Sequence, residues 1–224
     1  MNETVIIVQG HNAAWYPPER ATVQLSIGFD GPDRQSVFDA TTRAAETVRS
    51  MIVTLGAAQP GPISRWSSDS VSVWNERPWN NEGKQLALVF HATIGFTVRF
   101  NDFEVMTRWL DAVAAVDSVT VGGIEWSLTA VRKAAVFAEA QSLAVADAVT
   151  RATVYARSLG LESVRAIALA DPGMLGDHGS GPAPGPLARG AMMMADSRGG
   201  RAELALTPQR IEVSASVDAR FVAA

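Results

Sequence analysis

The sequence has no cysteine among its 224 residues. Disulfides, thiolate nucleophiles and thiolate metal sites are therefore excluded. Positive charge is not in excess either, because 19 Lys and Arg stand against 23 Asp and Glu and leave a net charge of -4. This is the wrong sign for a polyanion partner, so we expect no binding of nucleic acid.

Long hydrophobic runs are also missing. The apolar stretches are far shorter than a membrane span, so we expect no membrane insertion. The first eight residues lack the basic start, the apolar stretch and the cleavage site of a signal peptide. The sequence as written therefore predicts a cytoplasmic protein.

Local motifs for catalysis or cofactor binding are absent. There is no Gly-Lys-Ser/Thr phosphate loop and no Gly-x-Gly-x-x-Gly. The three histidines, His11, His91 and His178, form no His-Glu-x-x-His pair. We expect His91 on the polar face of a strand and His11 in a turn between the first two strands. The sequence therefore predicts a protein that is not an enzyme and uses no cofactor or metal.

One segment contains the residue types of a hydrolase triad. Asp177, His178 and Ser180 lie within five residues of one another. However, a nucleophile elbow needs Gly-x-Ser-x-Gly on a tight turn between a strand and a helix, and this segment has neither that spacing nor those flanks. A hydrolase is therefore the least favoured of three functional hypotheses.

Two hydrophobic periods alternate along the chain. A period of two predicts strands over residues 21–29, 86–100, 121–128, 163–169 and 211–221, with a less regular strand over 63–74. Periods of three and four predict three helices. The first runs from Asp33 as N-cap to Gly56 as C-cap, the second opens at Asp102, and the third ends at Gly160.

The buried stripe of each helix follows from the same spacing. The three predicted stripes are Val37, Ala40, Ala44, Val48, Met51 and Leu55; then Met106, Leu110 and Val113; then Ala138, Ser142, Val145, Val149, Ala152, Ala156 and Leu159. Because hairpins dominate the order of elements, we infer an α+β fold. It has a largely antiparallel sheet, helices packed on one face and a C-terminal strand. We expect one domain over residues 1–224, with a Gly/Pro-rich loop over 172–206.

Four segments carry a resemblance to a known family. They are an opening strand that ends in Val-Gln-Gly at 8–10, Pro-Glu-Arg-Ala-Thr-Val at 18–23, the alanine-spaced helix over 132–161, and the Pro-x-x-Ile-x-Val-x-Ala-x-Val ending within 207–217. In order and spacing the chain resembles the SIMPL-domain family, also described as oxidative-stress defence proteins of the bacterial envelope. The resemblance implies an α+β domain that self-associates and has no established catalytic residues. Bacterial members are linked to stress tolerance, and an animal member is linked to kinase signalling.

Large apolar residues in polar surroundings are the candidates for interaction. We expect the segments 63–74 and 86–100 to form a long antiparallel hairpin. Trp66, Trp74 and Trp79 cluster around this hairpin, and Met192, Met193 and Met194 interrupt the late loop. The leading hypothesis is a self-associating scaffold or protein-interaction module. We expect a homo-oligomer, with another protein as the alternative partner. A second hypothesis is a small-molecule or glycan binder that uses the hairpin aromatics. The tryptophans can equally pack on the sheet core and on their own loop.

Overall fold

The computed structural model describes residues 3–57, 61–81, 83–175 and 206–224. These residues form three helices and eight strands in antiparallel sheets, and the chain closes with a strand. The α+β class and the order of elements are therefore confirmed. The chain divides into two compact units, one of residues 17–128 and 202–209 and the other of the remaining residues. That they act as one domain stays a prediction.

The unit of residues 17–128 holds a five-stranded sheet with the order β3-β5-β2-β6, and β4 also pairs with β5. Its elements are β2 (Arg20–Gly31), α1 (Arg34–Gly56), β3 (Ile63–Ser68), β4 (Ser72–Glu76), β5 (Val89–Phe100), α2 (Phe103–Ala114) and β6 (Val119–Ser127). Both β3 and β4 pair with β5 in antiparallel register. The hairpin expected between residues 63–74 and 86–100 is therefore present, with its first arm broken into two strands.

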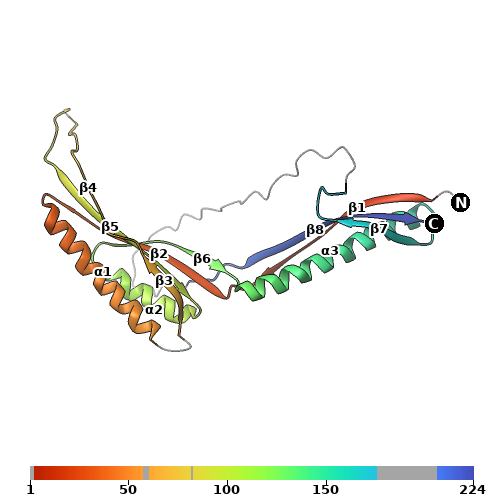
Figure 1. The fold of residues 1–224 in the computed structure, drawn as a ribbon, viewed down its shortest axis with the longest axis horizontal. Helices are drawn as coiled ribbons and strands as arrows, with labels where there is room; N and C mark the ends of the chain where they lie inside the picture. The colour runs from red at the N-terminus through yellow and green to blue at the C-terminus, as the bar shows by residue number, and fades with distance from the viewer. Residues whose placement is uncertain (1–2, 58–60, 82, 176–205) are drawn as a thin grey trace. The chain divides into compact units, whose positions relative to one another are not determined.

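The helices α1 and α2 cover one face of this sheet (Figure 1). Alternation along β2 places Val23, Leu25 and Ile27 in the core, because every second side chain of a strand points to the same face. On α2 the expected stripe of Met106, Leu110 and Val113 is buried. On α1 the buried stripe is Val37, Thr41, Ala45, Val48 and Ile52, so the helix is turned slightly from the predicted orientation.

The two ends of α1 differ from each other. The carboxylate of Asp33 accepts a hydrogen bond of 2.8 Å from the backbone N–H of Ser36, as expected of an N-cap. The prediction of Gly56 as C-cap is wrong. Gly56 is the last helical residue and Ala57 is the cap, in a right-handed conformation. Since neither Gly56 nor Ala57 has a positive φ, the conformational freedom of glycine is not used at these two positions.

The other unit holds a three-stranded sheet with the order β1-β8-β7 and one long helix. Its elements are β1 (Thr4–Tyr16), α3 (Ala130–Ser158), β7 (Val164–Ala170) and β8 (Ile211–Ala223). The first and last strands of the chain are neighbours, with Thr4 opposite Ala223 and Tyr16 opposite Ile211. The sheet of this unit therefore forms only when the two termini meet.

The strand β1 is longer than its sequence suggests. His11 was expected in a turn, but it lies in the middle of β1, opposite Ser216. Its Nδ1 is 3.0 Å from the hydroxyl of Ser216. The expectation is wrong because β8 pairs with all 13 residues of β1, which keeps the chain extended past Gly10 to Tyr16.

The buried face of α3 is a stripe of one valine and five alanines at every fourth position, namely Val136, Ala140, Ala144, Ala148, Ala152 and Ala156. The predicted stripe is correct at Ala152 and Ala156 and wrong at four exposed positions, Ala138, Ser142, Val149 and Leu159. Close packing explains the choice of alanine. A Cβ on Gly10 would lie only 2.7 Å from the backbone nitrogen of Ala148. Gly160 follows the helix with a φ of 78°, as expected of a glycine that ends it.

The outer edge of β1 is covered by side chains from α3. The backbone N–H of His11 donates to the carboxylate of Asp147 at 3.0 Å, and the guanidinium of Arg151 donates to the carbonyl of Gln9. Unpaired backbone groups of an edge strand are a template for pairing with another chain. At the centre of β1, Asp147 and Arg151 bind two of these backbone groups, so the groups are not free to pair with another strand.

Candidate functional site

The candidate site is the β4–β5 hairpin. Val73 lies opposite Ala92, which is buried on the helix-covered face of the sheet. Because side chains alternate, the next pair, Trp74 and His91, lies on the face that α1 does not cover. Beyond the strands, Trp79 and Gln85 form an isolated bridge that narrows the connecting loop.

Trp74 and His91 stack on this open face. Their ring centroids are 5.3 Å apart and the ring planes differ by 18°. The Nε2 of His91 lies 3.5 Å from Oε1 of Glu76, which is an ion-pair distance when the imidazole is protonated. The expectation that His91 lies on the polar face of a strand is met. The stack holds one face of the Trp74 ring and leaves 46% of the residue exposed.

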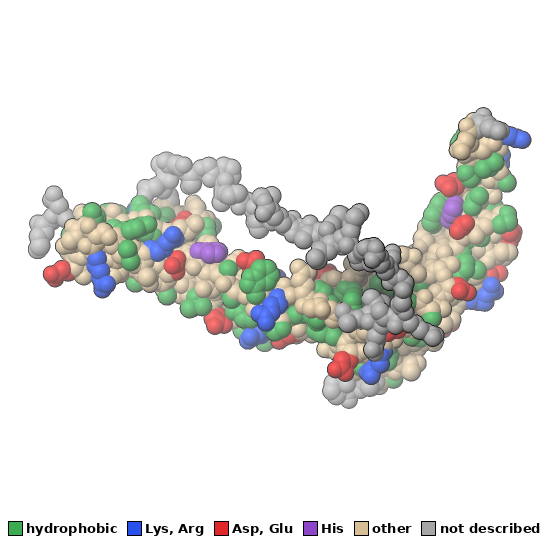
Figure 2. All heavy atoms as spheres, turned by 180° about the vertical axis from the view of Figure 1, so that it is seen from behind, with side chains coloured by type: hydrophobic (Ala, Val, Ile, Leu, Met, Phe, Trp, Pro, Cys, Tyr) green, Lys and Arg blue, Asp and Glu red, His purple; other side chains and the backbone are tan. Residues whose placement is uncertain are grey.

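Large apolar side chains are exposed farther along the hairpin. Trp79 is 65% exposed and Leu86 is 45% exposed. Figure 2 shows the hairpin as an arm on which hydrophobic side chains lie among charged ones, around a histidine. Trp66 differs from the other two tryptophans of the predicted cluster, because it packs against the hydrophobic core from β3. The structure therefore leaves Trp74 and Trp79 accessible and Trp66 half-buried.

Several predicted residues lie outside the described part of the chain. They are Met192, Met193 and Met194 of the late loop, and Asp177, His178 and Ser180 of the triad-like segment. Within the described residues, no three His, Asp or Glu side chains gather closely enough to hold a metal ion. None of the helices described is both long and apolar enough to cross a membrane.

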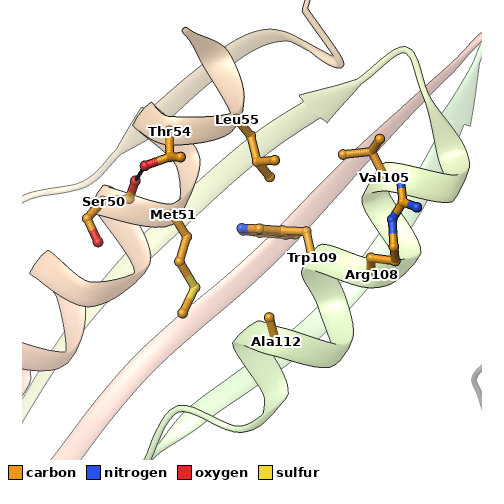
Figure 3. A pocket seen from close by; sticks show the side chains of 8 residues that line it. All are labelled: Ser50, Met51, Thr54, Leu55, Val105, Arg108, Trp109 and Ala112. Atoms are coloured by element: carbon orange, nitrogen blue, oxygen red, sulfur yellow. Dashed lines mark hydrogen bonds between the residues drawn. The ribbon is translucent and has the colours of Figure 1, made fainter. Parts of the chain in front are cut away.

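A pocket between α1 and α2 was not foreseen from the sequence. It has a volume of about 470 Å³ and is lined by four residues from each helix: Ser50, Met51, Thr54, Leu55, Val105, Arg108, Trp109 and Ala112 (Figure 3). The only hint in the sequence is Trp109, which lies next to Leu110 of the predicted stripe of α2. Periodicity alone does not show that two helices stand far enough apart to leave a pocket.

Comparison with known proteins agrees with the resemblance seen in the sequence. The family model described as "SIMPL: Protein of unknown function (DUF541)" matches residues 6–221. The chain belongs to the SIMPL family. No curated protein matches it. The SIMPL match includes strands of both units, from β1 to β8, and its description names no reaction.

Proposed function

We propose that this SIMPL protein is a non-catalytic, self-associating interaction module, and that the β4–β5 hairpin is its contact surface. One observation carries the proposal: Trp74, Trp79 and Leu86 are all exposed on the same hairpin. Aromatic residues dominate the energetics of protein interfaces, and exposed apolar groups that cluster mark interaction sites. A role in stress tolerance, which the family resemblance implies, is part of the proposal.

A second copy of the chain is the partner that this surface suits. In a two-fold contact the same patch faces itself, so each tryptophan meets an apolar partner. Burying about 100 Å² of apolar surface on each of Trp74 and Trp79 contributes roughly 2.5 kcal/mol per side chain. The four side chains of a pair then contribute about 10 kcal/mol, which is similar to the cost of association. Without these rings that cost is no longer offset, so we expect the assembly to depend on them.

The test is the mass in solution, measured by light scattering over a concentration series. We expect the wild type to form an oligomer of defined mass, and the double variant Trp74→Ala, Trp79→Ala to shift to monomer with an unchanged circular dichroism spectrum. Trp15→Ala is the matched control, because Trp15 is 55% exposed on β1 in the other unit. A wild type that stays monomeric, or a double variant that assembles like it, contradicts the proposal.

The Trp74–His91 stack also favours the second hypothesis, binding of a glycan. Stacking on His91 holds the Trp74 ring in one orientation, with Glu76 beside it as a hydrogen-bond acceptor. A sugar ring that packs on the exposed part of Trp74 should change the tryptophan fluorescence, and Trp74→Ala should remove that change. Unchanged fluorescence through titration with a panel of neutral oligosaccharides counts against this function.

A further inference from the structure

The pocket between α1 and α2 has an apolar floor. Trp109 forms its base and is 97% buried, since only 3% of the residue is exposed. Its ring packs against Phe100 of β5 with centroids 5.1 Å apart, so the indole is held in place by the core. Met51, Leu55 and Val105 are half-buried around it. The volume of about 470 Å³ falls in the range typical of small-molecule sites.

One buried donor in this pocket has no partner. The indole nitrogen of Trp109 exposes less than 1 Å² and makes no hydrogen bond to any described residue. Figure 3 shows the ring pointing its nitrogen from α2 toward α1, into the gap between the helices. A buried N–H without an acceptor costs about 1–3 kcal/mol. Because less than 1 Å² of the nitrogen is exposed, it does not serve as a donor to a ligand in this pocket. Met51 lines the same pocket, and its flexible thioether side chain can adapt to a ligand.

The polar groups of the rim are donors or are already bonded. The hydroxyl of Ser50 donates to the carbonyl of Thr47, and that of Thr54 donates to the carbonyl of Ser50. Among the described residues, Arg108 is the only charged one that lines the pocket, and it is exposed. Within the described chain no carboxylate lies within ion-pair distance of its guanidinium. As far as the described residues go, the pocket therefore offers a positive charge and holds no anion.

We propose that the α1–α2 pocket binds a small amphipathic carboxylate, with its apolar body against Met51, Leu55 and Trp109 and its carboxylate within reach of Arg108. A guanidinium recognises a carboxylate through paired, charge-assisted hydrogen bonds. This site uses other residues than the β4–β5 hairpin, so it is independent of self-association.

The experiment is a calorimetric titration of the full chain with dodecanoate below its micelle concentration. We expect saturable binding of one molecule per chain. Arg108→Gln should weaken it about tenfold, as loss of one charge-assisted hydrogen bond predicts. Ala112→Leu fills the pocket from an exposed position on α2 and should abolish binding while preserving the helix.

Two controls separate this site from adventitious binding. Arg43→Gln removes an exposed arginine of α1 that does not line the pocket, and it should leave the affinity unchanged. Dodecyltrimethylammonium has the same chain length and the opposite charge, and it should bind far more weakly. The proposal is overturned if dodecanoate shows no saturable binding, if the cationic amphiphile binds equally well, or if Arg108→Gln and Ala112→Leu both bind like wild type.

Discussion

Replacing Gly10 by alanine tests the close packing of α3 on β1. The added methyl group would lie 2.7 Å from the nitrogen of Ala148 and 2.8 Å from its Cβ, and closer still to the carbonyl oxygen of Ala144. Ordinary van der Waals contact begins at 3.4 Å. Two of these atoms belong to the helix backbone, so a change of rotamer cannot relieve the clash. The whole helix has to move away from the sheet.

The expected cost follows from this displacement. Overpacking a well-packed core typically costs 1–3 kcal/mol, and a clash with helix backbone belongs at the upper end, about 3 kcal/mol. The shift also pulls Asp147 and Arg151 away from the backbone of β1, which they cap. For a chain of this size, about 3 kcal/mol lowers the melting temperature by about 6–12 °C.

Thermal unfolding followed by far-ultraviolet circular dichroism measures this shift. Gly28→Ala is the matched control, because Gly28 also lies within a strand and its added Cβ would meet no atom closer than 3.7 Å. Since alanine suits a strand better than glycine, the control should melt at the wild-type temperature or slightly above it. If Gly10→Ala melts within about 1 °C of the control, the close approach of α3 to β1 is refuted.

Two further predictions concern single carboxylates. Asp147→Ala leaves the N–H of His11 uncapped, so we expect about 1 kcal/mol of lost stability and more aggregation by light scattering, whereas Glu139→Ala on the same helix should change neither. At Asp33, the hydrogen bond from the Ser36 N–H lowers the pKa of the carboxyl. The stability from this cap is therefore present above the ordinary aspartate pKa and lost as pH falls through the lowered value. The melting temperature of wild type should fall relative to Asp33→Asn below about pH 4, and parallel curves for the two proteins would contradict this.

The order of elements and the fold class follow from the sequence because each depends on local periodicity. Alternation over residues 21–29 and 211–221 identifies strands before any partner is known. Asp33 and Gly160 mark helix ends because a side-chain acceptor and a positive φ are local requirements. Among the interaction candidates, the sequence indicated the hairpin tryptophans but did not separate the half-buried Trp66 from the exposed Trp79.

Only the tertiary structure decided which residues face one another across long sequence separations. The strand β1 extends to Tyr16 because β8, about two hundred residues later, pairs along its whole length. The buried stripe of α3 is alanine rather than its larger neighbours because Gly10 lets the helix backbone approach the sheet. The α1–α2 pocket exists because the two helices pack on one sheet and leave a gap between their facing side chains beside Trp109. Periodicity in the sequence shows which face of a helix or strand is buried. The distance between two elements depends on the side chains of the element packed against it, and a local pattern does not contain that information.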